Sequence, residues 1–233
     1  MKYLIWIVLL FPILVKAQLD FNKAEKYFQQ GQFSQAKVLF ENIVKDNPNH
    51  LKGLEYLGDI QGSLQNWDKS ISYYKRLKKL KPSEANYYYK YGGALGMKAK
   101  ESNTFKALGM IGEVKSSFEK AIQLNPKHIE ARWALIELYL QLPGIIGGSE
   151  AKATQYANEL AKLSPVDGYL SKGHIAEYFE RYGEAAKQYK LAIEVGKSKV
   201  CYQKLADLYK NKMKQPEKAK LILEDFEKIG VIQ

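Results

Sequence analysis

The sequence predicts an all-α fold, a right-handed superhelical solenoid of about six antiparallel helix pairs. A small residue, an aromatic residue four positions later and a proline eight positions after that recur along the chain. A second small residue often stands twelve or thirteen positions before the first. The apolar residues between these positions follow the period of a helix rather than that of a strand. A helix pair cannot bury both of its faces alone, so repeated pairs are expected to stack.

Copies of the repeat follow one another along most of the chain. The small, aromatic and proline positions are Ala36, Phe40 and Pro48; Ser70, Tyr74 and Pro82; Val114, Phe118 and Pro126; Ala153, Ala157 and Pro165; Ala185, Tyr189 and Lys197; and, in a degenerate last copy, Ala219 and Leu223. The earlier small positions include Ala24, Gly58, Gly173 and Ala206. We therefore place the pairs at about 18–50, 51–84, 85–128, 129–165, 166–198 and 199–229, within a single solenoid over residues 18–233.

Each type of residue in the repeat has a physical role. Small residues such as Gly58 and Ser70 let the two helices of a pair approach closely. The aromatic residue is expected to fill the gap between one pair and the next. Pro82 stands where the second helix must stop, because proline lacks the N–H that would continue it.

This spacing resembles the tetratricopeptide repeat (TPR) signature, in which W-x2-L-G-x2-Y precedes A-x3-F and a proline. Leu57 and Gly58 match its first half, and Leu205, Ala206 and Tyr209 form a later copy. The resemblance covers nearly all of the chain after residue 17. It implies a helical solenoid that binds other proteins.

The first residues form a separate segment. Lys2 precedes an apolar run of 13 residues, Tyr3 to Val15, and a small-residue cleavage pattern ends at Ala17. This arrangement predicts a signal peptide over residues 1–17 that is cleaved before Gln18. The alternative is an uncleaved anchor, but a membrane-spanning helix needs about 20 apolar residues. We therefore expect an exported protein, periplasmic or secreted.

Charge and cysteine content narrow the range of partners. The formal net charge is +11, and loss of Lys2 and Lys16 with the leader would leave +9 (11 − 2). A basic exported protein suits an anionic neighbour such as a membrane surface or an acidic polymer, although the positive charge can equally serve solubility alone. Nucleic acid is not expected as a partner. The single cysteine, Cys201, cannot form an internal disulfide and is expected to be a small buried residue.

Two segments depart from the repeat. The third pair carries about ten extra residues within 98–112, which predict either an elongated helix pair, a protruding loop or a docking element. The fourth pair contains a longer turn from Pro143 to Gly148, with Ser149 as the expected cap of the following helix. The turn is expected to be tight, with Ile145 and Ile146 partly buried; the alternative is an anion site at its backbone N–H groups. This Pro-Gly-x-x-Gly-Gly turn resembles that of a subset of exported bacterial TPR proteins.

No catalytic pattern accompanies the repeat. His50 and His128 each follow a proline of the repeat, as turn residues, and His174 stands alone on a predicted helix. The sequence contains no H-E-x-x-H motif, no cysteine–histidine metal spacing and no G-x-S-x-G motif. We expect no enzyme activity, no cofactor and no metal.

In TPR proteins the first helix of each pair lines the concave face, and the resemblance implies which residues of this chain lie there. The candidate partner-binding residues are Phe21, Glu25, Phe28, Glu55, Asp59, Tyr89, Trp133, Glu137, Leu170, His174, Glu177 and Tyr178. The acids at all such positions are Glu25, Glu55, Asp59, Glu130, Glu137, Asp167, Glu177 and Asp207, against Lys52 and Lys210. We expect an acidic concave face with Trp133 or Tyr89 exposed, and a basic convex face that includes residues 75–81. Alternatively, the acids are simply solvated and some of the rings belong to the core.

These features predict a non-catalytic scaffold of the cell envelope that binds a basic or apolar protein segment in its groove. The alternative is a binder of an envelope polymer or membrane surface that uses the basic outer face. High salt would weaken the second mode more than the first, because exposed charges are screened.

Overall fold

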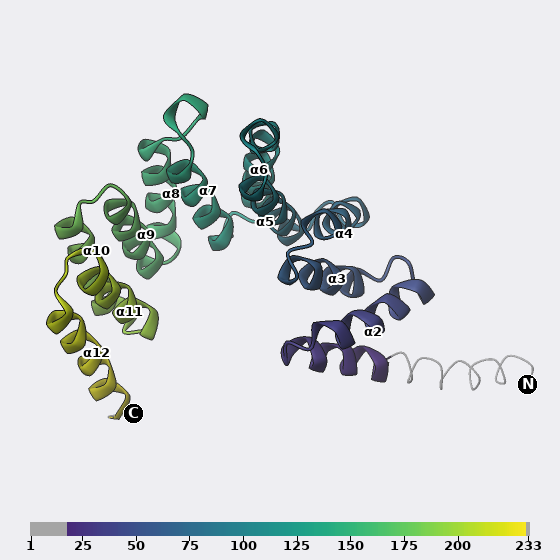
Figure 1. Cartoon of the computed structure of the whole chain (residues 1–233), viewed down its shortest axis with the longest axis horizontal. Coiled ribbons are helices and arrows are strands. Elements are labelled where there is room, and N and C mark those ends of the chain that lie inside the picture. The colour runs from purple at the N-terminus through teal and green to yellow at the C-terminus, as the bar shows by residue number, and fades with distance from the viewer. Residues whose placement is uncertain (1–17, 232–233) are drawn as a thin grey trace, which may run out of the picture. The chain divides into compact units, whose positions relative to one another are not determined.

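The computed structural model describes residues 18–231, and the regular structure in that range is entirely helical (Figure 1). The predicted leader, residues 1–17, lies outside the described residues. A first helix covers residues 18–29. The elements after it are α2 (Phe33–Asp46), α3 (Leu51–Ser63), α4 (Trp67–Leu80), α5 (Ala85–Glu101), α6 (Thr104–Leu124), α7 (Ile129–Gln141), η1 (Gly144–Ile146), α8 (Glu150–Leu163), α9 (Pro165–Tyr178), α10 (Tyr182–Gly196), α11 (Lys199–Asp207), η2 (Leu208–Lys212) and α12 (Pro216–Val231).

The helices form two compact units, Met1–Leu124 and Asn125–Gln233, called here the N-terminal and C-terminal units. Within each unit every α-helix from α2 onward packs on the next, and α7 also packs on α9. The predicted all-α fold of stacked helix pairs is therefore confirmed, while the right-handed superhelix and the single continuous solenoid stay predictions. None of the helices described is both long and apolar enough to cross a membrane.

The helix pairs that carry no extra residues share one type of turn between their two helices. A residue with positive φ occurs in the turns after the first helix, α3, α9 and η2: Gly31, Gln65, Glu180 and Lys214 respectively. Each lies in the left-handed region, which lets the chain reverse within a few residues. Gly31 adopts this conformation without strain, whereas for a residue with a Cβ atom it costs about 1 kcal/mol. Stacking of the helix pairs must outweigh that cost.

Small residues face aromatic rings across the helix pairs, as expected. A Cβ atom on Gly58 would lie 2.8 Å from Cε1 of Tyr74, and the Ser70 hydroxyl donates to the Gly58 carbonyl at 2.9 Å. The expected filling of the gap between pairs is seen at Phe40, whose ring stacks on Tyr56 of the next pair at 4.6 Å. The ring of Tyr74 also fills space within its own pair.

Several of the helices begin at a capping side chain. Nδ1 of His50 accepts from the Gly53 N–H, and Nδ1 of His128 accepts from the Ala131 N–H. Burial lowers the pKa of His128, which keeps the ring neutral and able to accept. The two histidines, predicted to be turn residues, therefore also cap the helices that follow the turns. Pro165 follows the end of its pair at Leu163, as expected, and it also opens α9 as its first residue.

The extra residues of the third pair extend its helices rather than form a loop. Helices α5 and α6 are 17 and 21 residues long, and only Ser102 and Asn103 separate them. None of residues 100–113 is buried.

The turn from Pro143 to Gly148 separates α7 from α8, and Ser149 caps α8 by accepting from the Lys152 N–H, as predicted. The expected burial of Ile145 is wrong, because its side chain is 97% exposed. The backbone N–H groups that an anion would need donate within the protein instead: Gly147 to Gly144, Gly148 to Pro143, and Ser149 to Tyr139.

The core of each unit includes small and aromatic positions of the repeat. In the C-terminal unit a buried cluster contains Ala185, Tyr189, Leu205 and Ala206. Cys201 is fully buried, as its lack of a partner suggested. Leu223, in the degenerate last copy, is 37% exposed.

Substitutions at two neighbouring glycines on α5 can test the close contact between a small residue and the ring of Phe118. A Cβ atom at Gly92 would lie 2.9 Å from Cε1 of Phe118, whereas one at Gly93 would meet nothing within 4 Å. We expect Gly92→Ala to lower the free energy of unfolding by about 1–3 kcal/mol through overpacking. Gly93→Ala should raise it by about 0.5–1 kcal/mol, because alanine favours the helix. Urea unfolding followed by circular dichroism measures both, and equal effects would contradict this packing.

Candidate binding surfaces

A charged cluster joins α3 to α5 in the N-terminal unit. Nζ of Lys90 lies 2.9 Å from Oε1 of Glu55 and 2.7 Å from Oδ2 of Asp59. Lys52 pairs with the second oxygen of Glu55 at 3.1 Å, and Asn86 donates to the first at 3.3 Å. The cluster therefore ties two successive helix pairs together.

Burial and charge act against each other in this cluster. Burial alone would raise the pKa of Glu55, but Lys90 and Lys52 outweigh it, so the pKa is lowered. Burial would likewise lower the pKa of Lys90, but Asp59 and Glu55 raise it. Both groups are therefore charged at neutral pH, and the two acids are matched by two lysines. The acidic face expected from the sequence is compensated here by Lys52 and by Lys90, which is not among the positions predicted to line the groove.

The candidate residues of the first helix lie against the core. Phe21 and Phe28 are partly buried and pack on the cluster that contains Phe40. The Tyr56 hydroxyl donates to Glu25 at 2.7 Å. The two phenylalanines thus match the alternative in which some groove rings belong to the core.

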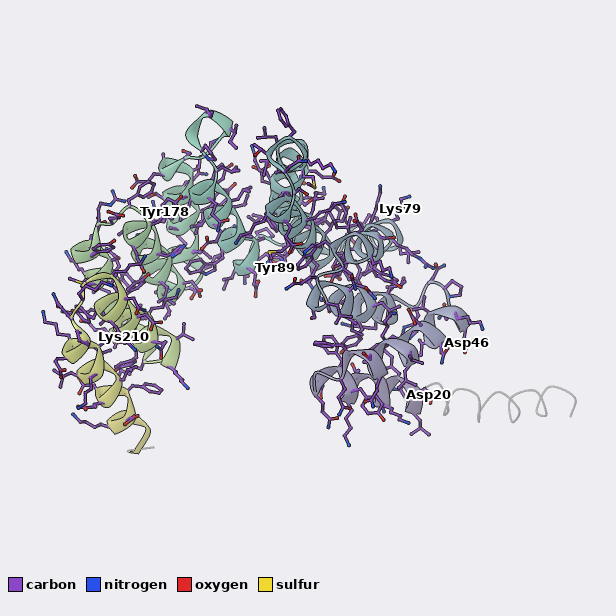
Figure 2. The ribbon with its side chains drawn as sticks, viewed as in Figure 1. Asp20, Asp46, Lys79, Tyr89, Tyr178 and Lys210 are labelled. Atoms are coloured by element: carbon purple, nitrogen blue, oxygen red, sulfur yellow. The ribbon has the colours of Figure 1, made fainter. Side chains whose placement is uncertain are left out.

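Tyr89, labelled on α5 in Figure 2, lines a hollow of about 220 Å³ together with Tyr74, Asp59 and Lys90. Its ring also lies 6.0 Å from that of Phe118. Tyr89 is half-buried, so it presents one part of its ring rather than a free side chain.

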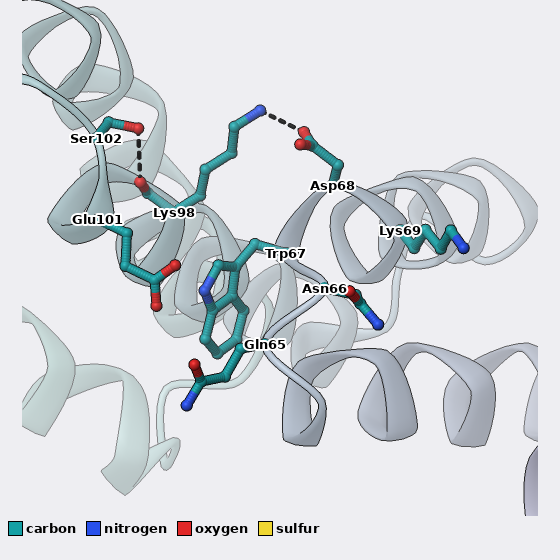
Figure 3. A pocket seen from close by; sticks show the side chains of 8 residues that line it. All are labelled: Gln65, Asn66, Trp67, Asp68, Lys69, Lys98, Glu101 and Ser102. Carbon is teal, nitrogen blue, oxygen red and sulfur yellow. Dashed lines mark hydrogen bonds and ion pairs between the residues drawn. The ribbon is translucent and has the colours of Figure 1, made fainter. Parts of the chain in front are cut away.

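A second hollow in the N-terminal unit, of about 400 Å³, lies between the α3–α4 turn and the end of α5 (Figure 3). Its lining is polar, and an ion pair between Lys98 and Asp68 closes one side. Nε1 of Trp67 has no acceptor among the described residues. No nucleophile is paired with a base in this hollow, and no group of three His, Cys, Asp or Glu suited to a metal occurs within residues 18–231.

The C-terminal unit brings several candidate residues together. Nε1 of Trp133 on α7 donates to Asp167 on α9 at 2.8 Å, and the Ser164 hydroxyl donates to the other oxygen of Asp167 at 2.6 Å. One turn of α7 further on, Glu137 lies 2.6 Å from Nε2 of His174 on α9. Pairing with His174 lowers the pKa of Glu137. Trp133 is half-buried rather than fully exposed.

The remaining candidates follow along α9. The Tyr189 hydroxyl donates to Glu177 at 2.8 Å, while Tyr178 is 47% exposed (Figure 2). Leu170 packs against the core of the unit. We call the outward-facing set the α7–α9 surface. It consists of Trp133, Glu137, Asp167, His174, Glu177 and Tyr178.

The acids of the α7–α9 surface lack strong cationic partners. Within the described chain no lysine or arginine lies within ion-pair distance of Glu137, Asp167 or Glu177. Lys204 acts on Glu137 only from a greater distance. This surface differs in that respect from the compensated cluster around Lys90. The other two acids named from the sequence, Glu130 and Asp207, are exposed.

The basic run over residues 75–81 is partly used within the protein. Arg76 donates to the Pro48 carbonyl, and Lys81 pairs with Glu84 at 2.7 Å. Nζ of Lys78 lies 3.5 Å from the ring centre of Tyr91, and burial lowers the pKa of Lys78. The run therefore presents fewer free cations than its sequence suggests.

Comparisons with known proteins agree with the repeat. Tetratricopeptide repeat family models match residues 21–85 and 97–128. No curated protein matches the chain in sequence. Similar solved structures include a thermophilic TPR protein of Thermus thermophilus, which is 19% identical with a TM-score of 0.65 over 88% of this chain and 99% of that one.

Two further structures have the same architecture. PilW, a type IV pilus biogenesis factor, is 16% identical with a TM-score of 0.65 over 91% of this chain and 92% of its own. YrrB, a TPR protein with an unusual peptide-binding site, is 14% identical with a TM-score of 0.52 over 78% of this chain and 87% of its own. At such identities the likeness shows the fold. The chain thus carries TPR repeats, which generally serve as protein-interaction scaffolds.

Replacement of Lys90 tests the charged cluster. Lys90→Met should lower the free energy of unfolding by about 2–4 kcal/mol, because it leaves the carboxylate of Glu55 buried without its main cation. Lys52→Met is the control, since the Lys52 side chain is 66% exposed and should contribute at most about 1 kcal/mol.

The effect should depend on pH. The pKa of Glu55 is lowered in the folded protein, so the ionised carboxylate adds to the free energy of unfolding at pH values above its ordinary pKa of 4.5. That contribution is lost as the pH falls through the pKa of the folded state. In Lys90→Met burial raises that pKa, so the difference from the wild type should shrink in acid. Urea unfolding at a series of pH values measures the free energy of unfolding of both variants. Equal losses of this free energy in Lys90→Met and Lys52→Met would rule out this role of Lys90.

Proposed function

We propose that this chain is an exported, non-catalytic scaffold that binds a basic or apolar segment of another protein on the α7–α9 surface. The observation that carries the proposal is the grouping of Glu137, Asp167 and Glu177 beside aromatic rings, without lysine or arginine at ion-pair distance among the described residues.

Acids without a lysine or arginine partner favour a binding partner with positive charge. Glu137 and Asp167 lie on successive first helices, where a segment that crosses α7 and α9 would meet both. Complementary charges accelerate encounter and fix the orientation of a bound segment more than they add affinity.

Aromatic side chains would supply the affinity. Tyr178 is accessible, and Trp133 is fixed by its bond to Asp167, so its exposed edge is preorganised. Rings held in this way lose little conformational freedom on binding. Tyrosine and tryptophan are the residues most often found as anchors of protein interfaces.

The side chains that a reaction would use have structural roles instead. His50 and His128 cap helices, and Cys201 is buried beside Ser198. His174 is paired with Glu137. These contacts favour a binding role over catalysis.

Export rests on the sequence of residues 1–17. A fusion of residues 1–30 to a reporter enzyme that is active only outside the bacterial cytosol should be active, because the apolar run would direct secretion. Replacing two leucines of the run with arginine should abolish that activity. Amino-terminal sequencing of the exported protein should begin at Gln18; retention of the leader would instead indicate an anchor.

Binding can be tested with a synthetic peptide of alternating lysine and leucine, and a matched peptide with glutamate in place of lysine. The basic peptide should bind more tightly, because the surface is acidic. Tyr178→Ala should weaken its binding by about tenfold or more through loss of an anchor. Glu137→Gln should weaken it less and mainly slow association. Isothermal titration calorimetry and stopped-flow fluorescence measure these effects.

Glu194→Gln provides the control, because Glu194 is an exposed acid on α10 of the same unit. It should leave the affinity unchanged. Circular dichroism would establish that each variant is folded. Equal affinity for the two peptides, or equal effects of the Tyr178 and Glu194 variants, would contradict the proposal.

A further inference from the structure

The distal end of the α5–α6 hairpin exposes apolar side chains. We call residues 97–112 the hairpin tip. Phe105 is 89% exposed, Met97 42% and Leu108 40%. Ala107, Met110 and Ile111 are only half-buried.

Phe105 and Leu108 lie on the face of α6 that is turned away from its buried residues. Val114, Phe118 and Ala121 are its buried residues, and α6 packs on α5. The helical period of 3.6 places Phe105, Leu108 and Gly112 on the side opposite Val114. A Cβ atom at Gly109 or Gly112 would meet nothing within 4 Å, so no other described part of the protein covers this face.

The charge around the hairpin tip is positive. Lys100 and Lys106 are exposed, and neither has an ion-pair partner in the described chain. Lys98 is paired with Asp68. The sequence contains no acid from Ser102 to Gly112, and Glu101 is the one acidic residue of the tip.

We propose that the hairpin tip docks on the surface of an anionic lipid bilayer, with Phe105 and Leu108 entering the apolar boundary and Lys100 and Lys106 contacting headgroup phosphates. An apolar face flanked by lysines is the pattern of interfacial helices. The formal net charge of +9 (11 − 2) that remains without residues 1–17 would draw the protein toward the same surface.

The pattern favours lipid over a protein partner. A protein interface usually surrounds its apolar centre with polar groups of both signs. The exposed lysines belong to the same hairpin tip as the exposed ring of Phe105, and a bilayer surface needs no fixed acceptor to match them. The hairpin tip is also distinct from the α7–α9 surface, so one protein could bind a partner and a bilayer through different residues.

The test uses the chain from Gln18 onward, which removes the apolar leader and keeps the helices described above. Co-sedimentation with vesicles of phosphatidylglycerol and phosphatidylcholine should show binding, and vesicles of phosphatidylcholine alone should bind weakly. Phe105→Ser should weaken binding by about tenfold or more, from the apolar area that no longer leaves water. Lys106→Ala should weaken it by about fivefold at low salt.

Val38→Ser is the matched control, because Val38 is 56% exposed on α2 and lies outside the hairpin tip. It should bind vesicles like the unchanged chain. Phe105→Ser should retain peptide binding on the α7–α9 surface, which separates failure of this inference from failure of the proposed function.

Depth of insertion gives an independent readout. In Phe105→Trp, the added fluorescence should shift to the blue on vesicle binding and be quenched by lipids brominated in their acyl chains. Absence of vesicle binding, binding that Phe105→Ser leaves unchanged, or lack of quenching would overturn the proposal. Crosslinking from position 105 to a protein, without vesicle binding, would assign the tip to a protein interface instead.

Discussion

Each of the best-formed helix pairs depends on an aromatic ring that lies against a residue with little or no side chain. At Gly58 and Gly92 the ring of the second helix occupies the space that a Cβ atom would need. The small residue determines how closely the helices approach, and the ring determines what fills the space between them. Because both positions recur, the same geometry is repeated in each unit, where side chains of successive first helices come close enough to pair.

The tyrosines in these positions extend that constraint to the surface. Tyr74 donates to Asp59, and Tyr189 donates to Glu177 at 2.8 Å. Each hydroxyl therefore fixes an acid of the first helix, and burial beside that acid raises the pKa of both tyrosines. A phenylalanine would fill the same space but would leave the acid without this donor. The core contact thus also positions charged groups on the outward-facing side.

The sequence predicts the fold well because small and aromatic residues have strict spatial requirements. Charge placement was less predictable, since long side chains reach neighbouring positions. Lys90 was omitted because it lies one residue beyond Tyr89, yet its amine reaches Glu55 and Asp59 on the preceding pair. The exposure of Ile145 depended on a short 3-10 turn that residue types alone do not specify. Spacing likewise left open whether residues 98–112 extend helices or form a loop.

The same repeat gives two surfaces with different properties in the two units. In the N-terminal unit Lys90 bridges successive helix pairs and, together with Lys52, balances the charge of two acids, which favours stability of the stack. In the C-terminal unit the bridge between α7 and α9 is formed by Trp133 with Asp167 and by Glu137 with His174. Those contacts join the helices while leaving negative charge and aromatic edges available. A lysine at the position of His174 would remove much of that charge, so the choice of bridging residue decides whether a junction between repeats serves packing alone or also binding.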